Sequence, residues 1–322
     1  MSAVHPDVQA LLALGREAGS LPFEAMPPAE ARRAYGARRL LLQLPPDPVA
    51  ERRDLMIEGP GGPLRLRVYR GTGTQDGEIL PCLLYLHGGG WVLGDLESHD
   101  GICCRLANEA RCCVVAVDYR LAPEHPFPAA IEDAAAALGW VADEAGALRI
   151  DAARIAVGGD SAGGTLAAVL ALMGRDETAP ASVGQVLLYP AVDMVMRGES
   201  YGSTTGGMTI TPATMRYFID HYLPNPTDRA DWRASPLGAA SLRGAPPALV
   251  LTCGHDPLRD EGRLYAERLE REGVPVTALH LSDQTHGMLT MSKAINVVPG
   301  TLAFVGAALR ELWRRPFPAQ AR

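Results

Sequence analysis

The spacing of apolar and polar positions changes along the chain, and each spacing predicts a different kind of element. Apolar residues recur at helical intervals over residues 8–12, and a second helical stretch, 29–42, follows a Pro-Pro break, so two helices are expected first. Over residues 64–69 apolar and polar side chains alternate, which is the period of a half-exposed strand. Residues 54–58 can pair with this strand across a Gly-Pro-Gly-Gly turn. We therefore expect a hairpin to open a sheet.

After this hairpin, short apolar runs alternate with helical stretches. The expected strands are residues 82–86, 113–118, 155–158, 186–189, 248–253 and 276–281. The helical stretches between them include residues 129–144, 162–173 and 259–272. Near-continuous apolar strands separated by helices indicate a mostly parallel sheet that is covered on both faces. The predicted fold class is α/β, and residues 191–234, which lack a clear strand, are an expected insertion.

Composition and charge narrow the class of protein. The 322 residues are 47% hydrophobic and 21% charged, which is typical of a soluble globular chain. A net charge of −7 disfavours binding to nucleic acid or to anionic lipid. The only lysine, Lys293, does not follow a glycine, so the phosphate-binding loop of P-loop enzymes is excluded.

Cysteine spacing and the N-terminal residues bear on metal binding and on cell compartment. The six cysteines form no C-x-x-C pair, so they predict buried thiols and no metal site. The first residues lack the features of a secretory signal, and no apolar run approaches the roughly 18 residues of a membrane span. We expect a cytoplasmic protein without stable membrane association.

Two segments, 159–163 and 198–202, match the G-x-S-x-G pattern, and only their context separates them. A nucleophile elbow needs a strand, a tight turn and then a helix, which together lift the serine hydroxyl above the sheet. Ser161 lies between an expected strand and an expected helix. Ser200 precedes a run rich in glycine and threonine that does not favour a helix. Ser161 is therefore the candidate nucleophile.

A glycine triplet, His87-Gly88-Gly89-Gly90, directly follows the expected strand 82–86. Consecutive glycines let the backbone approach a bound carbonyl group and direct N–H donors at it, as in the oxyanion loops of lipases and esterases. We expect the amides of Gly88 and Gly89, together with the amide of Ala162 at the helix start, to form an oxyanion hole.

An acid and a base are then expected in the chain order Ser, Asp or Glu, His. Asp256 and His286 each lie in a loop that closely follows an expected strand, so both are placed at the sheet edge that carries Ser161. Asp260 and Glu261 lie inside the next expected helix and are interpreted as solvated or capping groups. The candidate triad is Ser161, Asp256 and His286.

Taken together, these motifs resemble the hormone-sensitive-lipase-like esterases, the bacterial family IV of the α/β-hydrolase fold. The matching segments are residues 87–100, 118–130, 159–164, 256–262 and 286–287. The resemblance implies a mostly parallel central sheet flanked by helices, with a helical cap. It also implies a serine carboxylesterase that hydrolyses short- to medium-chain carboxylic esters through an acyl-enzyme intermediate and without a cofactor.

By the same resemblance, residues 1–45 and 191–234 form the cap, and residues 46–190 and 235–322 form the catalytic core. Met288 stands where the family often has an aromatic residue, and the cap sequence is individual. The resemblance therefore leaves substrate preference open.

Apolar and aromatic residues near these motifs suit an adaptable pocket wall. The substrate-binding candidates are Trp91, Tyr189, Met208 and Phe218, with packing inside the cap as the alternative for each. Two other functions stay open, namely amide or lactone hydrolysis by the same triad and a non-catalytic small-molecule receptor on the same fold. The expected partner is a small-molecule ester, and a homodimer stays open.

Overall fold

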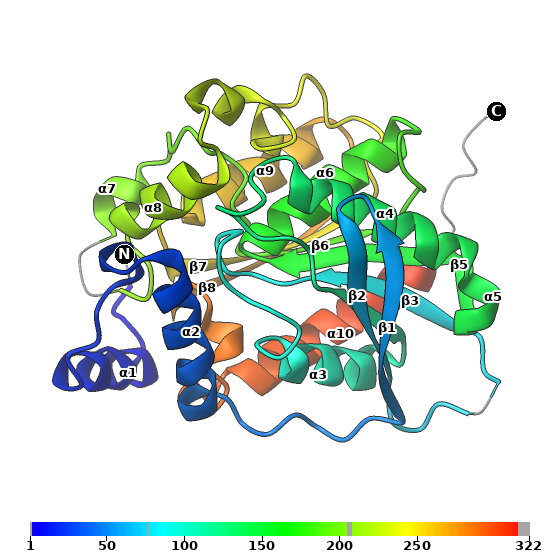
Figure 1. The fold of residues 1–322 in the computed structure, drawn as a ribbon, viewed down its shortest axis with the longest axis horizontal. Helices are drawn as coiled ribbons and strands as arrows, with labels where there is room; N and C mark the ends of the chain where they lie inside the picture. The colour runs from blue at the N-terminus through cyan, green and yellow to red at the C-terminus, as the bar shows by residue number, and fades with distance from the viewer. Residues whose placement is uncertain (1, 76, 205–207, 315–322) are drawn as a thin grey trace.

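One sheet of eight strands forms the centre of the molecule (Figure 1), in a computed structural model that describes residues 2–75, 77–204 and 208–314. The strands are β1 (Glu51–Gly59), β2 (Gly62–Arg70), β3 (Leu80–Leu86), β4 (Cys113–Val117), β5 (Ile150–Asp160), β6 (Gln185–Leu188), β7 (Ala248–His255) and β8 (Val276–Thr285). Their order across the sheet is β1-β2-β4-β3-β5-β6-β7-β8. The pairs β1–β2 and β2–β4 are antiparallel and the others are parallel. The predicted hairpin and the predicted α/β class are confirmed.

Helices cover both faces of this sheet. They are α1 (Pro6–Glu17), α2 (Pro28–Leu42), α3 (Asp100–Ala110), α4 (Ala129–Asp143), α5 (Ala145–Leu148), α6 (Ala162–Arg175), α7 (Ser200–Ser203), α8 (Pro212–Tyr222), α9 (Arg259–Arg271) and α10 (Val298–Arg314). Short 3₁₀ turns lie at η1 (Phe23–Ala25), η2 (Pro226–Ala230), η3 (Pro236–Gly238) and η4 (Met288–Thr290). In Figure 1, α4, α6 and α9 lie on the upper side of the sheet and α3 and α10 lie on the lower side.

Strand β4 shows why the sheet supports two hydrophobic cores. Cys113, Val115 and Val117 belong to the core on the face covered by α4 and α6, and Val114 and Ala116 belong to the core on the other face. All five side chains are buried. Because side chains alternate between the faces of a strand, an uninterrupted apolar run places a strand between two covered faces.

Two segments far apart in the sequence, η1 (just before α2) and the helix α8, lie side by side in the structure (Figure 1). The Thr214 hydroxyl donates to Glu24 at 2.8 Å, and the Tyr217 hydroxyl donates to the Met26 carbonyl oxygen at 3.0 Å. Helix α1 packs elsewhere, since its Val8 is buried in the core that contains α3 and α10. The contacts therefore join η1 and Met26, just before α2, to the 191–234 insertion and join α1 to the core that contains α3 and α10.

None of the helices in the described ranges combines the length and the hydropathy that crossing a membrane requires.

Candidate active site

Ser161 occupies a sharp turn between β5 and α6. Its backbone angles, φ 54° and ψ −119°, are unusual for a residue with a side chain, as expected of a strained nucleophile elbow. A Cβ atom at Gly159 or at Gly163 would overlap the Leu86 carbonyl oxygen. The two flanking glycines are therefore required by close backbone packing, which explains the G-x-S-x-G spacing.

Ser161, His286 and Asp256 form one continuous chain of hydrogen bonds. The Ser161 Oγ lies 2.8 Å from His286 Nε2, and His286 Nδ1 lies 2.8 Å from Asp256 Oδ2. The exposed fractions of the three residues are 8%, 5% and 0%. An ionised carboxylate only accepts hydrogen bonds, so Nδ1 carries the proton donated to Asp256 and Nε2 is left to accept the serine proton. The predicted triad residues are thus brought together in the order that proton transfer needs.

The acid and the base reach this position because their strands are neighbours. Strands β7 and β8 are parallel and pair up to His255 and Thr285, so Asp256 and His286 follow at the same sheet edge. The second oxygen of Asp256 accepts the Leu258 amide at 2.8 Å, which fixes the carboxylate. These contacts hold the acid before any substrate binds.

Thr209 supports the histidine and was not predicted. Its Oγ1 donates to the His286 carbonyl oxygen at 2.8 Å and lies 2.8 Å from Thr285 Oγ1. Thr209 stands in the insertion, and no motif marks it in the sequence. The insertion therefore contacts the catalytic loop directly.

The glycine loop adopts a conformation that requires glycine. Gly89 has φ 127° and Gly90 has φ 62°, and a Cβ atom at Gly90 would overlap the Phe218 ring. In the part of the chain that the structure describes, the amides of Gly89, Gly90 and Ala162 donate to no protein acceptor. These three amides are therefore available to a ligand.

Gly88 is a correction to the sequence prediction. Its amide donates to the Asp160 carboxylate at 3.0 Å, in a buried contact, and its nitrogen lies 3.2 Å from His99 Nε2. An N–H that already serves a buried carboxylate is not available to a substrate oxyanion. The expectation that Gly88 donates to the oxyanion is therefore wrong, whereas Gly89 and Ala162 keep that prediction.

His87, which opens the glycine loop, is a neutral structural group. Burial, with a smaller contribution from neighbouring His99, lowers the pKa of His87 to about 4. The ring stacks on Tyr119 at 4.2 Å, and its Nδ1 lies 2.9 Å from the Gly88 carbonyl oxygen, which only accepts. The imidazole therefore donates this hydrogen bond to Gly88 and fixes the position of the first glycine.

The expected pocket residues lie in different environments. The Phe218 ring packs against Gly90, and the Tyr189 ring meets the His286 ring edge to face at 4.8 Å. Trp91 is fully buried and stacks on Tyr222 at 4.5 Å, so it packs inside the protein as the alternative interpretation expected. Met208 is partly exposed. Contact of any of these side chains with substrate stays a prediction.

The interpretation of Glu261 as a solvated or capping group is wrong. Its side chain is buried, and its Oε1 accepts the amides of Val192 at 2.8 Å and Asp193 at 3.2 Å. Its Oε2 accepts the Tyr201 hydroxyl at 2.8 Å. All three donors lie in the segment after β6, so Glu261 attaches the start of the insertion to α9.

The other G-x-S-x-G serine has a structural contact in place of a base. Ser200 begins a single helical turn, α7, which its sequence did not predict. Its hydroxyl is buried and donates to the Pro257 carbonyl oxygen at 2.6 Å. The structure thus separates the two motifs as their contexts suggested.

Comparisons with known proteins agree with this geometry. A family described as having the alpha/beta hydrolase fold matches residues 83–290. Carboxylic ester hydrolase LipN of Mycobacterium tuberculosis is 46% identical over 74% of this chain, which spans 64% of LipN. Ethyl acetate hydrolase of Pseudomonas putida is 39% identical over 96% of this chain and 99% of its own length. The solved structure of ester-hydrolase EH1AB1 from the metagenome of Lake Arreo, with a bipyridine phosphonate derivative, matches with a TM-score of 0.92 and 40% identity, covering 96% of this chain and 98% of that chain.

Proposed function

This chain belongs to the α/β-hydrolase family and is a carboxylic ester hydrolase, and we propose that its Ser161 attacks short- to medium-chain esters and becomes acylated. The esterase relatives also support the resemblance to hormone-sensitive-lipase-like enzymes. The observation that carries the proposal is the continuous contact from Ser161 Oγ through His286 to Asp256. A hydroxyl, a base and an orienting acid in hydrogen-bond reach are what nucleophilic catalysis requires.

Acylation begins with proton transfer from Ser161 to His286. As the Oγ forms a bond to the ester carbonyl carbon, its proton passes to Nε2 and the carbonyl π electrons move to the oxygen. Asp256 holds the imidazole in the required tautomer and stabilises the imidazolium that forms. The product of this step is a tetrahedral intermediate with one negative oxygen.

The amides of Gly89, Gly90 and Ala162 are the donors for this oxyanion. Gly90 takes the place that the sequence assigned to Gly88, because the Gly88 amide is bonded to Asp160. Ala162 is the first residue of α6, where backbone N–H groups lack partners inside the helix. Each such donor typically contributes about 10²–10³ in turnover.

Collapse of the intermediate breaks the bond between the carbonyl carbon and the alkoxy oxygen. The proton held on His286 passes to that oxygen, and the alcohol leaves. Water then gives a proton to His286 and attacks the Ser161 ester, and the reverse transfers release the acid and restore the hydroxyl.

Esters of a short- to medium-chain acid with a small alcohol are the proposed substrate class. The name of the Pseudomonas putida relative, ethyl acetate hydrolase, states such a substrate for that protein, which aligns with 96% of this chain. In this chain, Phe218 packs against the glycine loop and restricts the space beside it. We assign residues 191–234, with the N-terminal segment 1–45, to a cap that shapes this space. The contact of Glu24 with Thr214 supports this for η1, whereas α1 packs into the core that contains α3 and α10.

A substrate panel tests the proposal. We expect kcat/KM for p-nitrophenyl esters to be highest between acetate and octanoate and to be low for palmitate, and Ser161→Ala to lower kcat by about 10³ or more. Higher kcat/KM for a p-nitroanilide or a lactone would favour the alternative hydrolases. A wild-type protein that turns over no ester and is not labelled by a phosphonate would favour a receptor.

A further inference from the structure

His99 lies beside the glycine loop, although it is distant in sequence from the triad and takes no part in the steps above. Its Nε2 lies 3.1 Å from Asp160 Oδ1 and 3.2 Å from the Gly88 nitrogen. The exposed fractions of His99 and Asp160 are 1% and 3%. A buried imidazole and a buried carboxylate therefore meet at the residue that begins the run of three glycines.

Asp160 is an acceptor for three converging donors. It receives the Tyr85 hydroxyl at 2.8 Å, the Gly88 amide at 3.0 Å and the His99 ring. Burial by itself raises the pKa of the Asp160 carboxyl, but the charge and hydrogen bond of His99, with the Tyr85 hydroxyl, hold that pKa below its usual value. A carboxylate only accepts, so the Nε2 proton of His99 points to Asp160 and the Gly88 amide donates to the same group.

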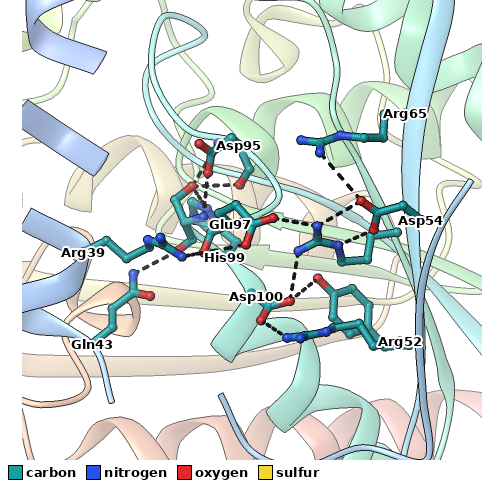
Figure 2. A network of polar contacts seen from close by, with 12 residues as sticks. Arg39, Gln43, Arg52, Asp54, Arg65, Asp95, Glu97, His99 and Asp100 are labelled. Atoms are coloured by element: carbon teal, nitrogen blue, oxygen red, sulfur yellow. Dashed lines mark hydrogen bonds and ion pairs between the residues drawn. The ribbon is translucent and has the colours of Figure 1, made fainter. Parts of the chain in front are cut away.

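The His99 ring is fixed from its other nitrogen. Its Nδ1 lies 2.9 Å from the Ser98 Oγ. Ser98 is closed into a tight turn with Asp95, because the Asp95 amide donates to Ser98 Oγ at 2.9 Å and the Ser98 amide donates to Asp95 Oδ1 at 2.6 Å (Figure 2). Gln43, the residue that follows α2, donates to the Ser98 carbonyl oxygen at 2.9 Å. The imidazole thus has little freedom to leave Asp160.

The next residue, Asp100, faces a separate set of partners in the same network (Figure 2). It accepts the Tyr69 hydroxyl at 2.9 Å, and it pairs with Arg67 at 3.3 Å and with Arg52 at 2.7 Å. None of these three side chains contacts Asp160 or Gly88 among the bonds of the described residues. Tyr69 therefore offers a control that weakens the network without touching the glycine loop.

We propose that His99 is a positioning residue for ester hydrolysis, which holds the glycine loop at a fixed distance from the nucleophile through Asp160 and the Gly88 amide. Asp160 immediately precedes Ser161, and Gly88 immediately precedes the first proposed oxyanion donor, Gly89. One carboxylate therefore ties the donor loop to the nucleophile, and His99 fixes that carboxylate. The inference rests on the proposed function of the glycine loop.

Two polar substitutions separate the two sides of the ring. The side-chain amide of Gln reaches the position of Nε2 and can donate to Asp160. The shorter amide of Asn reaches only the position of Nδ1 and keeps only the contact with Ser98. We expect His99→Asn to lower kcat for p-nitrophenyl butyrate by about 10- to 100-fold with KM changed less than about 3-fold, since an interaction made in the transition state is lost. The kcat of His99→Gln should be at least about 5-fold higher than that of His99→Asn, because Gln restores the donor to Asp160.

The rates are expressed per active site, counted by titration with a phosphonate, so that a misfolded fraction does not lower kcat. Tyr69→Phe is the matched control, and it should lower the melting temperature while leaving kcat per site within about 2-fold, as expected for a bond remote from the reacting atoms. If His99→Asn does not fold, Ser98→Ala releases the ring in a milder way and should lower kcat about 3- to 10-fold at constant KM.

The inference is overturned if His99→Asn, or Ser98→Ala in its place, keeps the wild-type kcat per site. It is also overturned if kcat per site falls equally in His99→Gln and His99→Asn. Those outcomes leave the proposed function intact as long as Ser161→Ala lowers kcat by about 10³ or more. A wild-type protein that the phosphonate does not titrate would instead contradict the proposed function itself.

Discussion

Replacing Glu261 by alanine removes the buried carboxyl group that attaches the insertion to α9. The side chain accepts two backbone amides, from Val192 and Asp193, and the Tyr201 hydroxyl. Alanine leaves both amides without this acceptor in a buried place. We therefore expect a large loss of stability from a residue that touches no part of the triad.

The size of the loss follows from these contacts. Three hydrogen bonds at about 1 kcal/mol each, with the added cost of two buried amides left unpaired, bring the expected loss to roughly 3–5 kcal/mol. For a chain of this length, 1 kcal/mol lowers the melting temperature by about 2 °C, so Glu261→Ala should lower it by roughly 6–10 °C.

Thermal unfolding followed by circular dichroism measures this effect. Glu267→Ala is the matched control, because Glu267 lies on the exposed face of the same helix. We expect its melting temperature to stay within about 1 °C of the wild type, as for most exposed substitutions. Equal losses in the two variants would refute the attachment role of Glu261.

Glu261 also predicts a pH dependence of stability. Burial raises the pKa of this carboxyl well above its usual value of 4.5, more than its hydrogen bonds lower it. Above about pH 4.5 the unfolded chain loses the proton while the folded chain keeps it, so stability falls as pH rises towards the folded-state pKa. Glu261→Gln removes this titration, and its melting temperature should fall less than that of the wild type between pH 5 and pH 8. Parallel curves would contradict the prediction.

Two further substitutions test the glycine loop and the contact between α2 and the core. Gly90→Ala places a methyl group into the Phe218 ring at a positive φ and should lower kcat at least about 10-fold. Adding Phe218→Ala should recover part of the lost kcat. An unchanged kcat in Gly90→Ala would contradict the close packing. Arg32→Ala removes two hydrogen bonds, each 2.7 Å long, to the carbonyl oxygens of Val92 and Ala122. It should lower the free energy of unfolding, measured in urea, by roughly 1–3 kcal/mol. Arg33→Ala, at an exposed position of the same helix, should leave that free energy unchanged.

The sequence predicted the triad because each member stands next to an element with a clear pattern. Ser161 lies between an apolar strand and a helix, and Asp256 and His286 follow strands that pair in parallel. Carboxyl ends of parallel strands meet at one edge, so local patterns were enough to bring distant residues together.

The prediction for Gly88 was wrong because a run of glycines does not say which amide is free. That depends on the Asp160 carboxylate, 72 residues further along the chain. Thr209 and Glu261 were missed for the same reason, since their partners lie 77 and 60 or more residues away. Short-range patterns predict elements and their order, but the partners of buried polar groups depend on the packed structure.

Mass spectrometry of the acylated protein during turnover of p-nitrophenyl butyrate tests the central claim most directly. We expect one butyryl group per chain, located on Ser161, in the wild type and in Ser200→Ala, whose serine lies in the other G-x-S-x-G segment. Ser161→Ala should show no added mass. Acylation of Ser161→Ala, or a butyryl group found on another residue of the wild type, would contradict the account.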